Sequence, residues 1–423
     1  MNIDPDRAIA ALFESRRLLD LLDVLNGEGE ETRIVGGAVR NALLGLPTGD
    51  VDLATTAHPD VVIARAKTAR FKPVPTGIDH GTVTIVVRGR PFEVTTLRQD
   101  IATDGRHATV RFGRDFDDDA RRRDFTVNAL SVSVDRTLHD PVGGLPDLSG
   151  GHIRFIGDPR ERIREDYLRI LRFFRFHAAY GEGQLDRAGL DAAIAEREGL
   201  GVLSAERIRA ELMKFVLARH AGKAAQEISD AGFFERIFGG IAYPLLFAQL
   251  TQIERTADDP LLRLGALAVS VREDADRLRA RLRLSNAEHK RLVDMADARA
   301  VWRNRDAVPE ERDLRTQLFL AGRAAASDAL ALTQAASGAP LDDAHWRAAA
   351  QYLAQTPEPR LPLTGEDVMA SGRVRGKLVG AALKSLQARW IRAGFPKEPA
   401  TVARLLDEVL SEVAPAPRAR TPP

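Results

Sequence analysis

Two neighbouring segments decide the fold: Arg33-Ile34-Val35-Gly36-Gly37-Ala38-Val39-Arg40-Asn41-Ala42-Leu43-Leu44-Gly45 and, shortly after it, Gly49-Asp50-Val51-Asp52-Leu53. The first predicts a short strand, a turn with paired glycines and a helix that ends at Gly45. Gly36 and Gly37 would let backbone N–H groups approach an anion at the helix N-terminus, with Arg40 one turn inside. Because such a turn is more often only a turn, this segment alone does not establish phosphate binding.

The second segment supplies two carboxylates. On a strand, residues i and i+2 point to the same side, so Asp50 and Asp52 would lie together. Paired carboxylates are costly unless cations lie beside them, and oxygen ligands without His or Cys favour Mg²⁺. An isolated Asp-x-Asp is also typical of a solvent-facing strand end, so the metal site needs further support.

A third acid, Glu93, lies in the alternating segment Pro91-Phe92-Glu93-Val94-Thr95-Thr96-Leu97-Arg98. If this strand lies beside the Asp-x-Asp strand, Glu93 completes a cluster able to hold a second metal ion or accept a hydroxyl proton. An outward-facing glutamate on an alternating strand would give the same pattern, so the placement of the strand decides whether Glu93 joins the two aspartates.

Around these segments the chain is first mixed and then helical. Short β-branched runs at 32–35, 51–53, 82–88 and 92–97 predict strands, the last two joined by a hairpin turn at 89–91. Helical spacing covers 7–25, and from about Asp158 onward the strand signals give way to successive amphipathic helices. The fold class is therefore α+β, with an all-helical second part.

Composition limits the class of protein. A chain of 423 residues should divide into about two to four compact units. It is 44% hydrophobic and 29% charged, which is typical of a soluble globular protein. It has no cysteine, which excludes disulfides and thiolate chemistry and fits a reducing compartment. Without a leader or a membrane-spanning stretch, a cytoplasmic protein with no membrane contact is expected.

Phosphate-binding candidates come from local arginine clusters, because Lys and Arg together number 61 against 60 acidic residues. The charged segment that begins at Arg98 predicts a mobile loop, and Asp117, Asp118 and Asp119 predict a helix start. The following run, 121–130, places Asp124 and Asn128 one turn apart, suited to phosphate and ribose.

A second cluster lies on a predicted helix around 164–176. Arg169, Arg172 and Arg175 recur every three residues and form a basic ridge. Such a ridge is usually a solvated face. Because a possible acidic metal cluster accompanies it in the same chain, a polyphosphate or RNA partner is the favoured interpretation.

Together these segments resemble the class II tRNA nucleotidyltransferase and bacterial poly(A) polymerase family, which has a polymerase-β-like head. Each matching motif is weak singly, but their order is specific. Asn41 departs from the family, which usually has Asp there. The matches are 36–40, Asp50-Val51-Asp52, Glu93 to Arg98, Arg122 to Ala129 and Glu165-Asp166-Tyr167-Leu168-Arg169 with Arg172 and Arg175, and Glu206-Arg207-Ile208-Arg209-Ala210-Glu211 resembles the next motif.

The resemblance implies a catalytic head with a small mixed sheet of five strands at 1–150, a helical neck at 151–225, a body at 226–355 and a tRNA-binding tail at 356–412. The proline-rich composition of the C-terminus at 413–423 predicts disorder there. The resemblance also implies that Asp50 and Asp52 bind two Mg²⁺ ions and act with Glu93 on the primer 3′-hydroxyl. The implied nucleotide-binding residues are Gly36, Gly37 and Arg40 for the triphosphate, Arg122 or Arg123 with Asp124 and Asn128 for phosphate and ribose, Asp166 and Arg169 for the base, and Arg172 and Arg175.

The implied function is template-independent addition of CCA to the 3′ end of tRNA from CTP and ATP, with release of pyrophosphate. The expected partners are therefore the tRNA acceptor end and top half, CTP and ATP. C and A both present an amino donor beside a ring-nitrogen acceptor, so a carboxylate paired with a guanidinium would accept these two bases and reject U and G. Oligomeric state is not predicted.

Three alternatives stay open. A poly(A) polymerase typically carries a basic run after the third strand of the head, whereas Gly77-Ile78-Asp79-His80-Gly81-Thr82 resembles the CCA-adding type. A variant restricted to CC or A addition is possible, because the loop from Arg98 to Asp124 governs that choice in the family. A catalytically silent RNA-binding protein would have no electrostatic reason to keep clustered carboxylates.

Overall fold

The structure, a computed structural model, describes residues 3–78, 81–103, 108–253, 259–303 and 305–413. The chain forms two compact units, Met1–Ala248 with Ala280–Arg283, and Gln249–Arg279 with Leu284–Pro423. None of the helices in the described ranges has the length and apolar content needed to cross a bilayer.

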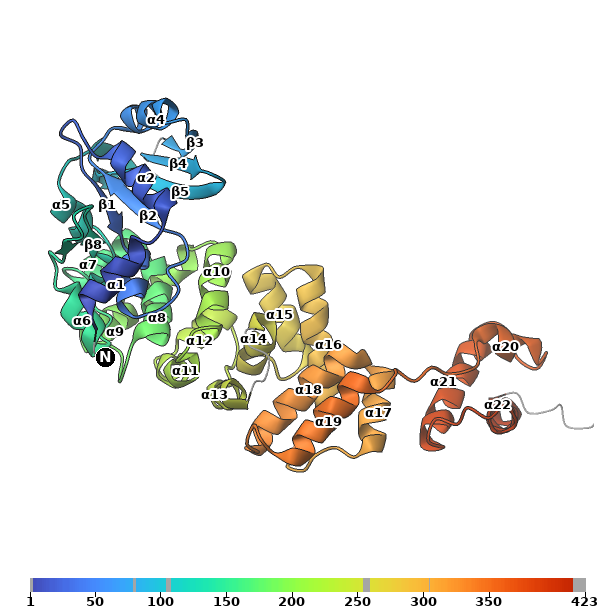
Figure 1. The fold of residues 1–423 in the computed structure, drawn as a ribbon. Coiled ribbons are helices and arrows are strands. Elements are labelled where there is room, and N and C mark those ends of the chain that lie inside the picture. Colours follow the sequence, from blue (N-terminus) through green and yellow to red (C-terminus); the bar gives the residue numbers. More distant parts are fainter. Residues whose placement is uncertain (1–2, 79–80, 104–107, 254–258, 304, 414–423) are drawn as a thin grey trace, which may run out of the picture. The chain divides into compact units, whose positions relative to one another are not determined.

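A mixed seven-stranded sheet lies in the first unit, in the order β3-β4-β5-β2-β1-β8-β9 (Figure 1). Five strands have four or more residues and two have only two, so the five expected strands are joined by two short additions. Within this sheet β2 and β5 are parallel, and the other neighbours are antiparallel. The strands are β1 (Thr32–Val35), β2 (Asp52–Thr55), β3 (Lys72–Gly77), β4 (Thr82–Val87), β5 (Arg90–Thr96), β8 (Ser131–Val132) and β9 (Leu138–His139).

Alternating side chains explain the central hairpin. Val83, Ile85 and Val87 of β4 are buried, while the residues between them are half-buried. The tight turn lies at Arg88 and Gly89, both in the left-handed region at φ 47° and 82°, because Val87 pairs with Arg90. The turn predicted at 89–91 is therefore one residue too late, since Arg90 and Pro91 already belong to β5.

Two predicted helices are interrupted. The helix expected over 7–25 is divided into α1 (Pro5–Leu12) and α2 (Arg16–Leu25). The helix expected around 164–176 is divided into α7 (Pro159–Glu165) and α8 (Leu168–Tyr180). Asp166 between them is extended, with φ −157° and ψ 107°. Its Oδ1 accepts a hydrogen bond of 3.1 Å from Leu168 N, a local side-chain bond that competes with helix continuation.

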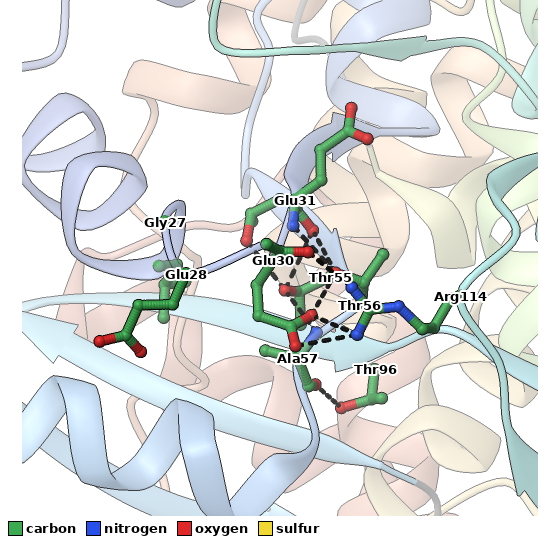
Figure 2. Close-up of polar contacts among 12 residues, drawn as sticks. Gly27, Glu28, Glu30, Glu31, Thr55, Thr56, Ala57, Thr96 and Arg114 are labelled. Atoms are coloured by element: carbon green, nitrogen blue, oxygen red, sulfur yellow. Dashed lines mark hydrogen bonds and ion pairs between the residues drawn. The ribbon is translucent and has the colours of Figure 1, made fainter.

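The segment predicted as a mobile loop after Arg98 instead contains the hairpin β6 (Arg98–Thr103) and β7 (Ala108–Phe112), with residues 104–107 outside the described part. Leu97 directly precedes β6 and Gly113 directly follows β7, and Gly113 N donates to Leu97 O at 2.7 Å. Next to it, Arg114 donates to both carboxylate oxygens of Glu30, at 2.8 and 2.9 Å (Figure 2). Thr56 also donates to Glu30, at 2.5 Å, so the hairpin exit is tied to the end of β2.

The remaining helices of the first unit follow the sheet or lie between its strands. They are α3 (Gly37–Leu43), α4 (Pro59–Thr68), α5 (Phe116–Arg121), α6 (Gly144–Gly150), α9 (Arg187–Ala195), α10 (Ala205–Val216), α11 (Ala221–Asp230) and α12 (Phe233–Phe238), with the 3₁₀ helices η2 (Thr126–Asn128) and η3 (Arg197–Val202). The mixed head followed by helices confirms the predicted fold class.

The second unit is helical and has two apolar clusters, one around Trp302 and Trp346 and one around Trp390 and Phe395. The predicted disordered C-terminus begins at 413, where α22 ends, and 414–423 lie outside the described residues. The helices from the end of the first unit onward are α13 (Pro244–Ile253), α14 (Pro260–Ala268), α15 (Arg272–Leu282), α16 (Asn286–Trp302), α17 (Glu311–Leu320), α18 (Gly322–Ser337), α19 (Ala344–Gln355), α20 (Gly365–Ala370), α21 (Lys377–Arg392) and α22 (Pro399–Val413).

Candidate active site

Two of the three predicted acids are paired across neighbouring strands. Asp52 is the first residue of β2 and lies in register with Glu93 of the parallel strand β5. Both are exposed, whereas the next pair, Leu53 and Val94, is buried at 1% exposure each. Because registered residues on adjacent strands share a face, the two carboxylates lie on the same side of the sheet.

Asp50 completes the acidic group from the segment before β2. Val51 between the two aspartates is buried, so Asp50 and Asp52 are the exposed positions of the alternation. Crowding by surrounding protein atoms raises the pKa of Asp52 although its side chain still reaches solvent, and Glu93 and Asp50 raise it further. Arg123 acts in the opposite direction. The negative charges of Glu93 and Asp50 therefore both act on Asp52.

These oxygen donors fit Mg²⁺. In the part of the chain that the structure describes, no three His, Asp or Glu side chains form a ready-made metal cage. Mg²⁺ usually needs only one or two carboxylates together with substrate phosphates and water. The acidic group thus suits an ion that is bound jointly with a nucleotide.

The glycine turn between β1 and α3 brings the backbone close to an arginine. Gly36 has φ +66°, and a Cβ there would lie 2.8 Å from Arg123 Nη1. The backbone conformation therefore favours glycine at this position, and a Cβ there would displace the Arg123 guanidinium. Gly37 is less constrained, because its Cβ would meet Arg40 Nη2 at an ordinary 3.6 Å.

Arg40 is a buried cation whose direct hydrogen-bond partners are neutral. Its side chain is 6% exposed and donates to Asn128 Oδ1 at 2.5 Å, to Asn41 Oδ1 at 2.8 and 3.1 Å and to the Tyr180 hydroxyl at 2.8 Å. The guanidinium also lies 4.0 Å from the centre of the Tyr180 ring. Burial lowers the pKa of Arg40. A buried cation without a bonded carboxylate is costly, which suits a site that receives an anion.

One buried carboxylate orients the neighbouring arginine pair. Asp119, 4% exposed, accepts from Arg122 Nε at 2.9 Å through Oδ1 and from Arg123 Nη2 at 3.1 Å through Oδ2. The helix start predicted from Asp117, Asp118 and Asp119 is confirmed, because all three lie in the first turn of α5, which Asp115 caps. Asp119 has a second role in holding the two arginines. Sequence reasoning missed Asp119 as a positioning residue of the site.

Asp124 links this region to α8. Its carboxylate accepts from Asn128 Nδ2 at 2.9 Å and from Arg172 Nε at 2.7 Å. Burial alone would raise the pKa of Asp124, but Arg172, together with the bonds from Asn128 and the Phe125 backbone, holds that pKa below its ordinary value. Asp124 is therefore a buried, paired carboxylate.

These groups surround a cavity of about 570 Å³. Ten of the eleven predicted nucleotide-binding residues line it, and Arg175 does not, because it pairs with Glu211 at 2.5 Å. Sequence reasoning missed three lining residues, Leu168, Phe176 and Arg207, although Leu168 and Arg207 lay in motifs that had been noticed. The lining is Gly36, Gly37, Arg40, Arg122, Arg123, Asp124, Asn128, Asp166, Leu168, Arg169, Arg172, Phe176 and Arg207.

Comparisons with known proteins identify relatives of this chain. Residues 32–154 match the family model of the poly A polymerase head domain. The mitochondrial CCA tRNA nucleotidyltransferase 1 of Mus musculus is 32% identical, over 94% of this chain and 89% of its own length. The CCA-adding enzyme of Limosilactobacillus fermentum is also 32% identical, over 95% of this chain and 98% of its own length.

The chain belongs to the class II CCA-adding tRNA nucleotidyltransferases. The resemblance predicted from its motifs is thereby confirmed. Among solved structures, the Bacillus stearothermophilus CCA-adding enzyme in complex with CTP has a TM-score of 0.72 and 28% identity, covering 94% of this nucleotidyltransferase and 98% of that chain. The Thermotoga maritima CCA-adding enzyme complexed with tRNA has a TM-score of 0.67 at 18% identity and supports the fold alone.

Proposed function

We propose that this nucleotidyltransferase adds CCA to the 3′ end of tRNA from CTP and ATP, without a nucleic-acid template and with release of pyrophosphate. One observation carries the proposal: Arg123 lines the basic cavity and also lowers the pKa of Asp52. This proximity supports the assignment of the cations and the acidic group to one site. Six arginines and two aspartates line the cavity, which gives it the excess positive charge that a triphosphate requires.

The acidic group would act on the end of the RNA primer. Asp50 and Asp52 would hold Mg²⁺, and Glu93 would act with them on the primer 3′-hydroxyl and can accept its proton. When bound, the ion activates the attacking oxygen and stabilises the departing pyrophosphate. The raised pKa of Asp52 supports this assignment, because its carboxylate is partly desolvated and also lies near the charges of Glu93 and Asp50.

The cavity residues would bind the nucleotide in three groups. Buried Arg40 would gain an anionic partner from the triphosphate, and Asp166 with Arg169 would select the base by accepting from its amino group and donating to its ring nitrogen. The assigned residues are Gly36, Gly37 and Arg40 for triphosphate, Arg122, Arg123, Asp124, Asn128 and Arg172 for phosphate and ribose, and Asp166 and Arg169 for the base. Arg175 would support this set through α8.

The remaining assignments extend the proposal beyond the site. The head at 1–150 would carry catalysis, the neck at 151–225 would carry base selection, and the body at 226–355 and tail at 356–412 would bind the acceptor end and top half of tRNA by shape and phosphates. The chain without cysteine suits the cytoplasm.

Supplying one nucleotide at a time tests this function. The protein is incubated with Mg²⁺, tRNA that lacks its last three nucleotides, and labelled CTP, ATP, UTP or GTP. CTP alone should add two residues, and ATP should add one residue only after them. A long A tail would instead indicate a poly(A) polymerase, and CTP addition without any A would indicate a CC-adding variant. RNA binding without any product would overturn the enzymatic proposal.

A further inference from the structure

Asp166, the proposed base-selecting carboxylate, has its ion-pair partner on a different helix from the one expected. Arg207 Nη2 of α10 donates to Asp166 Oδ2 at 2.7 Å. Arg169 instead pairs with Glu165 and donates to Arg162 O at 2.9 Å. The guanidinium that holds Asp166 therefore comes from a residue 41 positions later in the chain.

The packing of α8 against α10 does not depend on this pair. A deeper ion pair joins the two helices between Arg175 and Glu211, whose side chains are 14% and 6% exposed. Buried Phe174 and Leu212 also line one small apolar cavity between these helices. Arg207 and Asp166 are 39% and 29% exposed, and ion pairs with that access to solvent contribute little to stability.

The position of Arg207 instead connects it to the nucleotide cavity. Arg207 lines this cavity together with Asp166 and Arg169. Among the described residues, its guanidinium hydrogen-bonds only to Asp166. A carboxylate that must accept from the amino group of C or A needs a fixed orientation, and each oxygen keeps an acceptor site after one bond.

We propose that Arg207 is a positioning residue for nucleotide selection, which holds the Asp166 carboxylate in the orientation that accepts the amino group of C or A. This inference rests on the proposed function, because it assigns the residue that orients its base-selecting group. Without Arg207, the carboxylate can turn within the cavity, and the penalty against U and G falls.

Nucleotide discrimination by Arg207→Gln tests the inference. The measured quantity is the ratio of kcat/KM for CTP to that for UTP on tRNA that lacks its last three nucleotides. We expect this ratio to fall at least about tenfold, and Arg207→Lys to recover part of it. A purely structural role would lower kcat/KM for all nucleotides together and leave the ratio unchanged.

The matched control is Arg209→Gln, which removes the same charge from the same helix. Arg209 donates to Arg283 O at 3.3 Å and is not a lining residue of the cavity, so the ratio should stay within about twofold. In the background of Asp166→Asn, the further change Arg207→Gln should have no additional effect on the ratio, since the two residues act as one unit.

These measurements distinguish a failure of the proposed function from a failure of the role proposed for Arg207. If the unaltered protein incorporates no nucleotide, the proposed function fails. If it incorporates C and A, and Arg207→Gln remains folded with unchanged discrimination, only the role of Arg207 is refuted. Independent effects of Arg207→Gln and Asp166→Asn would also refute the positioning role.

Discussion

Asp52 shows how the site trades stability for binding. Its pKa is raised by crowding from surrounding protein atoms and by the charges of Glu93 and Asp50, so the folded protein disfavours the ionised carboxylate. The resulting loss of folding stability is absent below the unfolded-state pKa of Asp52, near 3.8. It appears as pH rises through the raised folded-state pKa. At neutral pH the ionised carboxylate should therefore reduce the stability of the metal-free protein.

We predict that Asp52→Asn raises the thermal midpoint of the metal-free protein at pH 7.5, and that its advantage disappears as pH falls toward 3.8. Mg²⁺ should stabilise the unaltered protein more than the variant. Scanning calorimetry with EDTA and with Mg²⁺ measures both effects. Equal midpoints at pH 7.5 would show that Asp52 is not under like-charge strain.

Asn41 replaces the usual family carboxylate and is suited to this chain. Its Oδ1 accepts from Arg40, and its Nδ2 donates to Pro47 O at 3.0 Å. Asn41→Ala would leave buried Arg40 donors unsatisfied, at a cost of about 1–3 kcal/mol. We expect lower stability and a higher KM for CTP. Asn41→Asp should keep most activity, because its Oδ1 can still accept from Arg40. Urea unfolding and initial rates compare the two variants. An Asn41→Ala variant with unchanged stability and unchanged KM would contradict this role of Asn41.

The turn between β1 and α3 is the element with the strictest steric demand. Gly36→Ala places a non-glycine residue at φ +66° with its Cβ against Arg123, whereas Gly37→Ala meets only an ordinary contact. The first change should cost about 1–2 kcal/mol of backbone strain and displace the Arg123 guanidinium. We predict a KM for CTP about tenfold higher for Gly36→Ala and within about twofold for Gly37→Ala. Equal KM values for the two variants would refute the close approach.

The hairpin β6–β7 depends on the contact at its exit. The hydrogen bond from Arg114 holds the pKa of Glu30 below its usual value, with a further contribution from Thr56. Because the pKa of Glu30 is lower in the folded protein than in the unfolded chain, the ionised carboxylate stabilises the fold above the unfolded-state pKa near 4.5. This stabilisation is lost as pH falls through the folded-state pKa.

We predict that Arg114→Gln costs at most about 1 kcal/mol at neutral pH, because the arginine is 59% exposed, and that this difference vanishes in acid. Faster hydrogen exchange at Gly113 N should accompany the loss. Urea unfolding at several pH values measures the first effect, and a difference that does not decrease as pH falls below about 4.5 would exclude Glu30 as its source.

Element boundaries show where sequence reasoning succeeds and where it stops. Alternation of apolar and polar residues predicts β4 and β5, because their buried faces impose a period of two. It does not predict the break at Asp166, which depends on one side-chain bond to Leu168 N. It also misses β3, whose sequence Lys-Pro-Val-Pro-Thr-Gly carries two prolines and pairs only with β4.

At the scale of the whole molecule, the sequence predicted residues that the structure brings together in the cavity and the acidic group, but not how their side chains pair. The acids and arginines were found because their types and spacing are unusual. The role of Arg207 was missed because it arises from a contact between helices. Asp119 was missed although its partners Arg122 and Arg123 are only three and four residues away, because it was interpreted as part of a helix start. A net charge of +1 likewise hides a cavity in which arginines outnumber aspartates three to one.

The most direct test of the account compares nucleotide incorporation and tRNA affinity for Asp50→Ala and the unaltered protein, with Mg²⁺, CTP and ATP. The account predicts that incorporation falls by on the order of 10³-fold or more, because the acidic group acts on the reacting oxygens. Affinity for tRNA should stay within about threefold, because it depends on phosphate contacts elsewhere. Retained incorporation, or loss of incorporation and affinity together, would contradict the central claim.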